Sequence, residues 1–189
     1  MKTGYNPTYV KDMALAKNEK IEGRALVYMP KDELEQIISA KPTSFTGQAL
    51  TLEVPSGEIV KGVSVKTLDN IFLDGVDFSS RAENLEKYKL IIKPKMVSFE
   101  HEYNALKNLG FAITPQVRIG AEMLVLNSKN EVVDRKYYES GNIDGETYMI
   151  NLQPTEAINK ILHQSLQKFV IKAINEIYYK DKPMFIIGN

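Results

Sequence analysis

Residues 88–103 read YKLIIKPKMVSFEHEY. Their apolar side chains fall on even positions up to Met96 and on odd positions after it. The two sets are Tyr88, Leu90, Ile92 and Met96, then Val97, Phe99, His101 and Tyr103. Because successive side chains of a strand point to opposite faces, this alternation predicts one long strand. The change of phase predicts a bulge or bend near residues 95–97, or a change in which face is covered.

Two further strands follow in the sequence. Residues 111–126 place a row of apolar side chains on one face: Val117, Ile119, Ala121, Met123 and Val125. Residues 127–130, Asn-Ser-Lys-Asn, have the composition of a hairpin turn, and residues 132–139 return as a partner strand. We therefore expect a long antiparallel meander over about residues 87–139.

A long amphipathic helix is predicted over about residues 154–177, beginning at Pro154-Thr155-Glu156. Its apolar stripe is Ile158, Ile161, Leu162, Leu166, Phe169, Val170, Ala173 and Ile177. A stripe of this spacing is typical of a helix that packs on a sheet. We expect five of these residues to be buried there: Ile161, Leu162, Leu166, Phe169 and Ala173.

A second principal helix is predicted over about residues 57–73, with Ser56 as its cap. Upstream of it, residues 24–29 and 49–54 have the character of short strands, and residues 31–39 that of one or two helical turns. Strands, a helix, a meander and a final helix together predict an α+β two-layer sandwich with a mainly antiparallel sheet.

The chain divides into three parts on this reading. Residues 23–180 form the single α+β domain, and residues 181–189 form a tail. Residues 1–22 are polar and turn-rich, which predicts an arm that is mobile or held only by surface contacts. The arm is interpreted either as a surface-draped terminus or as a tether to something else.

Composition excludes several functions. The 189 residues carry 24 basic and 24 acidic side chains, so no excess positive charge supports nucleic-acid binding. The absence of cysteine excludes disulfides, thiolate metal sites and a cysteine nucleophile. No apolar run has the length of a membrane span, and the sequence starts without a signal peptide.

Catalytic and metal chemistry find little support. Glu100 and Glu102 flank His101, but in a strand the two glutamates point away from the histidine and cannot share one metal with it. The only other histidine is His163, in the predicted final helix. No nucleophile-elbow or phosphate-cradling pattern occurs. We therefore expect no enzyme activity, no metal and no cofactor.

Two groups of side chains could bind a partner. The lysines Lys87, Lys89, Lys93 and Lys95 recur along one strand. They form either a solvated or protective strand face or a patch for an anionic partner, such as lipid headgroups or a glycan. Tyr137 and Tyr138 add aromatic side chains of the kind enriched in protein interfaces, although each also fits half-buried packing.

The order of these segments resembles a known family. A helix opens at residues 55–60 (Pro-Ser-Gly-Glu-Ile-Val) and ends at 71–73 (Ile-Phe-Leu), and a long strand opens at 88–94 (Tyr-Lys-Leu-Ile-Ile-Lys-Pro). A strand pair and a closing helix follow, at 117–126, 132–138 and 158–177. This order, over residues 24–177, is similar to the periplasmic domains of small bacterial outer-membrane lipoproteins. Examples are the curli-secretion lipoprotein, the penicillin-binding-protein activator lipoproteins and the amino-terminal domain of TolB.

The resemblance implies a non-catalytic role in scaffolding, envelope assembly or partner activation. The expected partner is another envelope protein or a second copy, with the membrane reached only through a lipid anchor that this sequence lacks. A chain trimmed at the lipid-bearing cysteine would lack both leader and cysteine, and so would a cytoplasmic protein. The alternatives are a soluble periplasmic or cytoplasmic module that binds a small ligand or glycan between sheet and helices, and an enzyme of unrecognised type.

Overall fold

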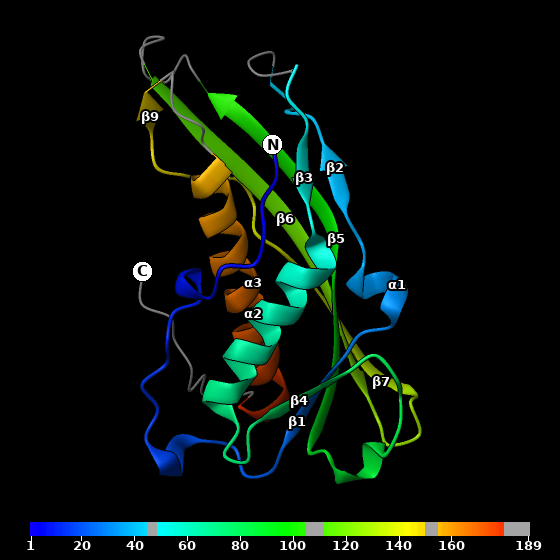
Figure 1. Cartoon of the computed structure of the whole chain (residues 1–189). Helices are drawn as coiled ribbons and strands as arrows, with labels where there is room; N and C mark the ends of the chain where they lie inside the picture. Colours follow the sequence, from blue (N-terminus) through cyan, green and yellow to red (C-terminus); the bar gives the residue numbers. More distant parts are fainter. Residues whose placement is uncertain (45–48, 105–111, 150–154, 180–189) are drawn as a thin grey trace.

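A computed structural model describes residues 1–44, 49–104, 112–149 and 155–179. Two long helices, α2 (Ser56–Ile71) and α3 (Thr155–Tyr178), lie side by side on one face of a twisted sheet (Figure 1). The predicted α+β class is confirmed. Pro154, residues 105–110 of the predicted connection and the tail at 181–189 lie outside the described residues.

The main sheet has the order β4-β1-β5-β6-β7. Its last three strands, β5 (Leu90–Asn104), β6 (Ala112–Leu126) and β7 (Val132–Glu139), form the predicted antiparallel meander. In contrast, β1 (Ala25–Tyr28) pairs in parallel with both β5 and β4 (Val76–Ser79). The expected mainly antiparallel sheet thus carries a parallel edge. Parallel neighbours need a crossover, and α2 lies in the connection that joins β1 to β4.

Two short strands continue along the edge of β6 that β7 occupies. β8 (Ile143–Asp144) pairs with residues 116–117 of β6, and β9 (Tyr148–Met149) pairs with residues 112–113. Most of this stretch had the sequence of a polar loop. Pairing here satisfies backbone groups of β6 beyond the point where β7 ends.

The prediction of helix over residues 31–39 is only partly right. α1 covers Lys31–Leu34, while β2 (Ile38–Ala40) pairs antiparallel with β3 (Leu52–Val54) as a separate two-stranded sheet. Ser56 is also not the cap of α2, because Pro55 occupies that position. The Ser56 hydroxyl instead donates a hydrogen bond to the Gln36 carbonyl oxygen at 3.1 Å. It therefore ties the start of α2 to the turn after α1.

The predicted bulge in β5 is confirmed. Met96 lies opposite Ala121 and Ser98 lies opposite Gly120, so Val97 is the extra residue, and it is 45% exposed. The bulge restores the alternation, and the apolar residues on both sides of it face the helices. The inner row of β5 consists of Leu90, Ile92, Pro94 and Met96, followed by Phe99, His101 and Tyr103.

The main core lies between the sheet and the two helices. All five α3 residues predicted to be buried are buried: Ile161, Leu162, Leu166, Phe169 and Ala173. A second, smaller cluster of Leu26, Leu85, Ile91 and Leu126 covers one end of the opposite face of the sheet. No helix in the described part of the chain is long and apolar enough to cross a membrane.

The amino-terminal arm packs more closely than expected. It runs along the two helices before turning back toward β1 (Figure 1). Its backbone forms isolated bridges at Lys2, with Glu53, and at Ile21, with Phe72. Val10 is 2% exposed. The structure therefore differs from the expectation of a segment held only by surface contacts.

Candidate functional site

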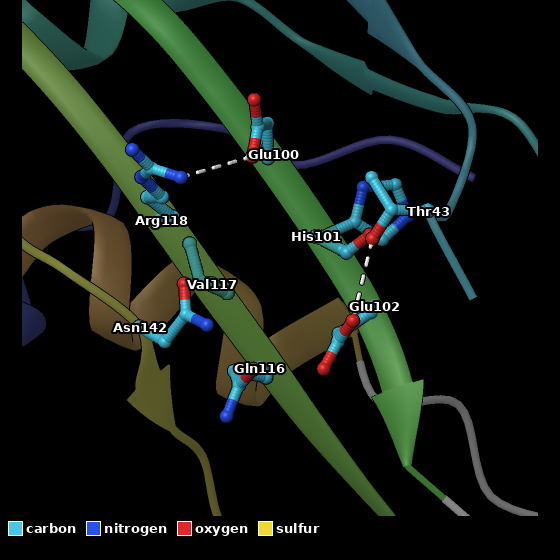
Figure 2. A pocket seen from close by; sticks show the side chains of 8 residues that line it. All are labelled: Thr43, Glu100, His101, Glu102, Gln116, Val117, Arg118 and Asn142. Carbon is cyan, nitrogen blue, oxygen red and sulfur yellow. Dashed lines mark hydrogen bonds and ion pairs between the residues drawn. The ribbon is translucent and has the colours of Figure 1, made fainter.

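The face of the sheet that points away from the helices, here called the outer face, carries a polar hollow of about 110 Å³ (Figure 2). β5 and β6 supply most of its lining. Thr43 enters from the segment after β2, and Asn142 enters from the turn between β7 and β8. The full lining is Thr43, Glu100, His101, Glu102, Gln116, Val117, Arg118 and Asn142.

Around this hollow, the guanidinium of Arg118 lies among several carboxylates. Arg118 binds Glu139 through its Nε and lies 3.9 Å from Glu100. Two effects of Glu139 raise the pKa of the Arg118 guanidinium: the hydrogen bond that Glu139 accepts is the larger, and its negative charge is the second. Gln116 Nε2 donates to Asp144 Oδ1 at 2.8 Å. The lining contains two carboxylates, Glu100 and Glu102, and one guanidinium, Arg118, so the hollow combines hydrogen-bonding capacity with an excess of negative charge.

His101 lies behind the hollow, on the inner side of β5. It is 2% exposed, whereas Glu100 on the outer face is exposed, as the alternation predicts. Its ring stacks on the Phe99 ring, with centroids 5.5 Å apart, and meets the Tyr103 ring edge-on, with centroids 5.4 Å apart. Burial lowers the pKa of His101 to about 4, so the ring is neutral at physiological pH.

Three buried polar atoms at this place find no hydrogen-bond partner among the described residues: both ring nitrogens of His101 and the hydroxyl of Tyr103. Burial also raises the pKa of the Tyr103 hydroxyl. A buried polar atom without a partner carries a desolvation cost. In the part of the chain that the structure describes, no group of three histidine, aspartate or glutamate side chains could hold a metal ion.

The four lysines proposed as a partner patch lie in different surroundings. Lys87 is 3.8 Å from Asp77 and lies over the ring of Tyr88. Lys89 is exposed near the turn at Gly23. Lys93 and Lys95 lie side by side on the outer face and both bind the same oxygen of Glu33, at 3.1 and 3.5 Å. The structure does not bring the four ammonium groups together as one open patch.

The two adjacent tyrosines point to opposite faces of β7. Tyr137 is on the outer face and 57% exposed, whereas Tyr138 is 6% exposed and faces α3. The Tyr138 hydroxyl donates to Glu176 at 2.9 Å, and burial first and this carboxylate second raise the pKa of Tyr138. Tyr138 is therefore a packing residue, and Tyr137 alone remains available to a partner.

An apolar outer-face centre, formed by Val97 and Tyr137 beside Gly120, was not recognised from the sequence. Gly120 pairs with Ser98, next to the bulge at Val97. A side chain at Gly120 would meet the Ser98 hydroxyl at 2.5 Å and the Tyr137 hydroxyl at 2.6 Å. The absence of a side chain lets Tyr137 lie across the strand. The sequence signal was the glycine on the polar side of an otherwise regular strand.

A second missed feature is the polar row on α3 that holds the arm. Asn159, His163 and Gln167 recur every four residues, so they lie on one side of the helix. Each bonds backbone atoms of the arm: Gly4 carbonyl oxygen, Asn6 N–H, and both groups of Lys11. We call these three residues the α3 polar row. Its only sequence signal was polar residues interrupting an apolar helix.

Comparisons with known proteins identify the fold. No protein-family model matches the sequence, and no curated protein matches it. Among solved structures, protein XCC0632 from Xanthomonas campestris, described as DUF330, is similar with a TM-score of 0.54 and 13% identity, over 93% of this chain and 92% of that one. At this identity the similarity shows a shared fold.

Two other structures are more distant. A neuraminyllactose-binding hemagglutinin homolog from Helicobacter pylori gives a TM-score of 0.49 at 13% identity, over 94% of this chain and 93% of that one. PelC from Paraburkholderia phytofirmans, a dodecamer, gives a TM-score of 0.38 at 10% identity, over 83% of this chain and 93% of that one.

Proposed function

We propose that this chain is a non-catalytic binding domain of the bacterial cell envelope, which recognises another protein through the outer face of its sheet. One observation carries the proposal: on that face Tyr137, 57% exposed, lies over Gly120, and Val97, 45% exposed, is the bulge residue next to Ser98, the partner of Gly120. Among the charged residues around this outer-face centre, Arg118 and Arg135 bind neighbouring glutamates. An aromatic anchor within a polar rim is the usual composition of a protein interface.

The pairing of the rim charges strengthens the argument for a protein partner. Arg118 is neutralised by Glu139 and Glu100, and Arg135 lies 3.1 Å from Glu122. The single guanidinium of Arg118 faces two carboxylates, so this part of the rim carries an excess of negative charge. An anionic lipid surface or a polyanion would instead favour unpaired lysines and arginines. The expected partner is another envelope protein or a second copy of this chain.

A photo-crosslinking experiment tests the binding face. A photoreactive phenylalanine analogue replaces Tyr137, and a matched control places it at Leu73, which is 37% exposed at the end of α2. We expect a discrete crosslinked product in cells from the Tyr137 position and not from the Leu73 position. A product of twice the chain mass would identify a second copy as the partner. Equal labelling at both positions, or none at Tyr137, would contradict the proposed face.

The envelope location is the second part of the proposal. It is supported by the similar order of segments in outer-membrane lipoprotein domains, whose arm joins the domain to the inner face of the outer membrane. The test is fractionation of the native full-length protein with whatever precedes Met1. Recovery in the outer membrane, with release when the lipid-bearing cysteine is changed to serine, is expected. Recovery in the cytosol would contradict the location and leave the binding face to be judged separately.

A second candidate function rests on the polar atoms of His101 and Tyr103 that find no partner among the described residues. A small ligand between sheet and helices that offers both a donor and an acceptor would satisfy them. Native mass spectrometry of protein purified from its own source tests this candidate. A bound small molecule that is lost in His101→Phe supports ligand binding, and a mass equal to that of the chain alone contradicts it.

A further inference from the structure

The α3 polar row recognises the backbone of the arm. Asn159 Nδ2 donates to the Gly4 carbonyl oxygen at 2.9 Å. Gln167 accepts from the Lys11 N–H at 3.0 Å and donates to the Lys11 carbonyl oxygen at 2.7 Å. Between them, His163 Nε2 accepts from the Asn6 N–H at 2.9 Å. These contacts hold residues 4–11 against the helix by backbone hydrogen bonds.

Two tyrosines of the arm enclose the His163 ring. Tyr5 stacks on it with centroids 5.6 Å apart, and Tyr9 meets it edge-on at 5.5 Å. Tyr5 can lie there because Gly62 of α2 has no side chain: a methyl group at Gly62 would come within 2.4 Å of the Tyr5 ring. His163 is accordingly 0% exposed.

The hydrogen bonds fix the protonation state of His163. Nδ1 lies 2.8 Å from the Asn159 carbonyl oxygen, which can only accept, so Nδ1 carries the proton. Nε2 faces the Asn6 N–H, which can only donate, so Nε2 must be bare. Adding a proton to Nε2 would set two donors against each other in a buried place. The docked arm therefore requires neutral imidazole.

Among the described residues, the charged groups near His163 are engaged with other partners. On α2, the Lys66 ammonium donates to the Pro7 carbonyl oxygen at 3.0 Å and pairs with Asp12 at 3.1 Å. On α3, the Glu156 carboxylate accepts from the Tyr9 hydroxyl at 3.0 Å. Burial lowers the pKa of His163, and its bond to the Asn159 carbonyl only partly opposes this.

We propose that His163 is an acid-operated latch, in which uptake of a proton at Nε2 releases residues 4–11 of the arm from α3. The released ring gains solvent and the ordinary proton affinity of imidazole, near pH 6.5. Since the docked state binds the proton less well, acid favours the released state by linkage. The latch concerns a different surface from the binding face and holds or fails independently of the proposed function.

The test is an NMR titration of the full chain from pH 7.5 to 5. Ring ¹⁵N shifts report the tautomer and protonation of His163, and amide exchange, corrected for its intrinsic pH dependence, reports protection of Asn6 and Lys11. We expect the Nδ1–H tautomer at pH 7.5. As the pH falls, protection of Asn6 should decrease by up to about tenfold per pH unit, the limit for one coupled proton, while β5 stays protected.

Two variants separate the latch from general acid sensitivity. In His163→Gln the side-chain oxygen can still accept from Asn6 but does not titrate, so the arm should stay protected to pH 5. In His101→Phe, which removes the only other histidine, acid release should persist. Release in His163→Gln at the same pH as in the parent, or protection of Asn6 in the parent down to pH 5, would overturn the proposal.

A third variant keeps the test decisive if His163→Gln does not dock its arm at pH 7.5. Gly62→Ala should push Tyr5 out and free the arm without touching the imidazole. The pKa of His163, read from the ring ¹⁵N shifts, should then rise toward the ordinary value for imidazole. An unchanged pKa of His163 with a freed arm would show that docking and protonation are not coupled, and would contradict the latch.

Discussion

Tyr138 of β7 stacks on Phe169 of α3, with ring centroids 5.7 Å apart and planes inclined by 22°. This contact joins the last strand of the meander to the long helix, and it buries both rings. Phe169 also lies in the row of α3 side chains that the sequence predicts to face the sheet. This pair therefore offers the most direct test of the packing between the two layers of the sandwich.

Truncating Phe169 to Ala should lower the free energy of unfolding by about 3–5 kcal/mol, because a large buried side chain is lost and a cavity remains. Urea titration followed by circular dichroism measures this change. Phe169→Leu is the matched control and should cost less, since it retains most of the apolar volume. A loss below about 1 kcal/mol for the alanine variant would show that the helix does not depend on this contact.

Replacing Gly120 with Ala should displace Tyr137. The new methyl group would lie about where the Ser98 and Tyr137 hydroxyls meet, and Tyr137 can move because it is exposed. We expect the free energy of unfolding to fall by about 1 kcal/mol, the low end for inserting a methyl group into packed surroundings. The double variant with Tyr137→Ala should recover part of that cost. Additive effects of the two changes would show that the Tyr137 ring does not lie over Gly120.

The two lysines on Glu33 provide a test of a shared counter-ion. Glu33 is only 13% exposed in its side chain and binds both Lys93 and Lys95. Glu33→Gln leaves two neighbouring ammonium groups without their carboxylate, and the free energy of unfolding should fall by about 1–3 kcal/mol. Glu35→Gln is the control, because its pair with Lys31 is exposed and should matter by less than about 0.5 kcal/mol. Equal effects would contradict the shared site.

Acid should destabilise the fold through His101. Its pKa is about 4 in the folded chain and near 6.5 when free, so the unfolded chain takes up the proton first. Stability is thus lost as the pH falls from about 6.5 toward 4, by on the order of 3 kcal/mol from this group. Denaturant titrations at pH 7 and 4.5 measure the difference. The variant His101→Phe should show a smaller difference in the free energy of unfolding between the two pH values. An unchanged difference in that variant would show that another group causes the acid sensitivity.

The local patterns in the sequence predict the elements that depend on neighbouring residues. The alternation at Leu90–Asn104 predicts a strand and its phase change predicts the bulge at Val97, because each side chain's face follows from its position. The α3 stripe is predictable for the same reason. The opposite faces of Tyr137 and Tyr138 follow from this rule as well, so the sequence already contained the argument against treating them as one surface.

Features that depend on distant partners were not predictable. β4 has four residues and forms by pairing in parallel with β1. No local sequence pattern predicts this pairing. Glu33 binds both Lys93 and Lys95 only because the folding of the chain brings α1 to these lysines of β5. The α3 polar row bonds to backbone atoms of the arm, and a sequence does not display which backbone atoms will be within reach. The candidate surfaces depend mostly on such contacts between residues that are distant in the sequence.

The docking of the arm changes what an anchor at the amino terminus could do. A free arm of about 20 residues would give the domain an r.m.s. reach on the order of 25 Å and leave it free to tumble. In the docked state the Met1 ammonium lies 2.8 Å from the Thr51 carbonyl oxygen, beside β3. A membrane anchor attached there would keep the domain close to the membrane and limit the orientations that it can take. The docked arm would then set the direction in which the outer face points toward its partner. Only release of the arm would turn it into a flexible tether.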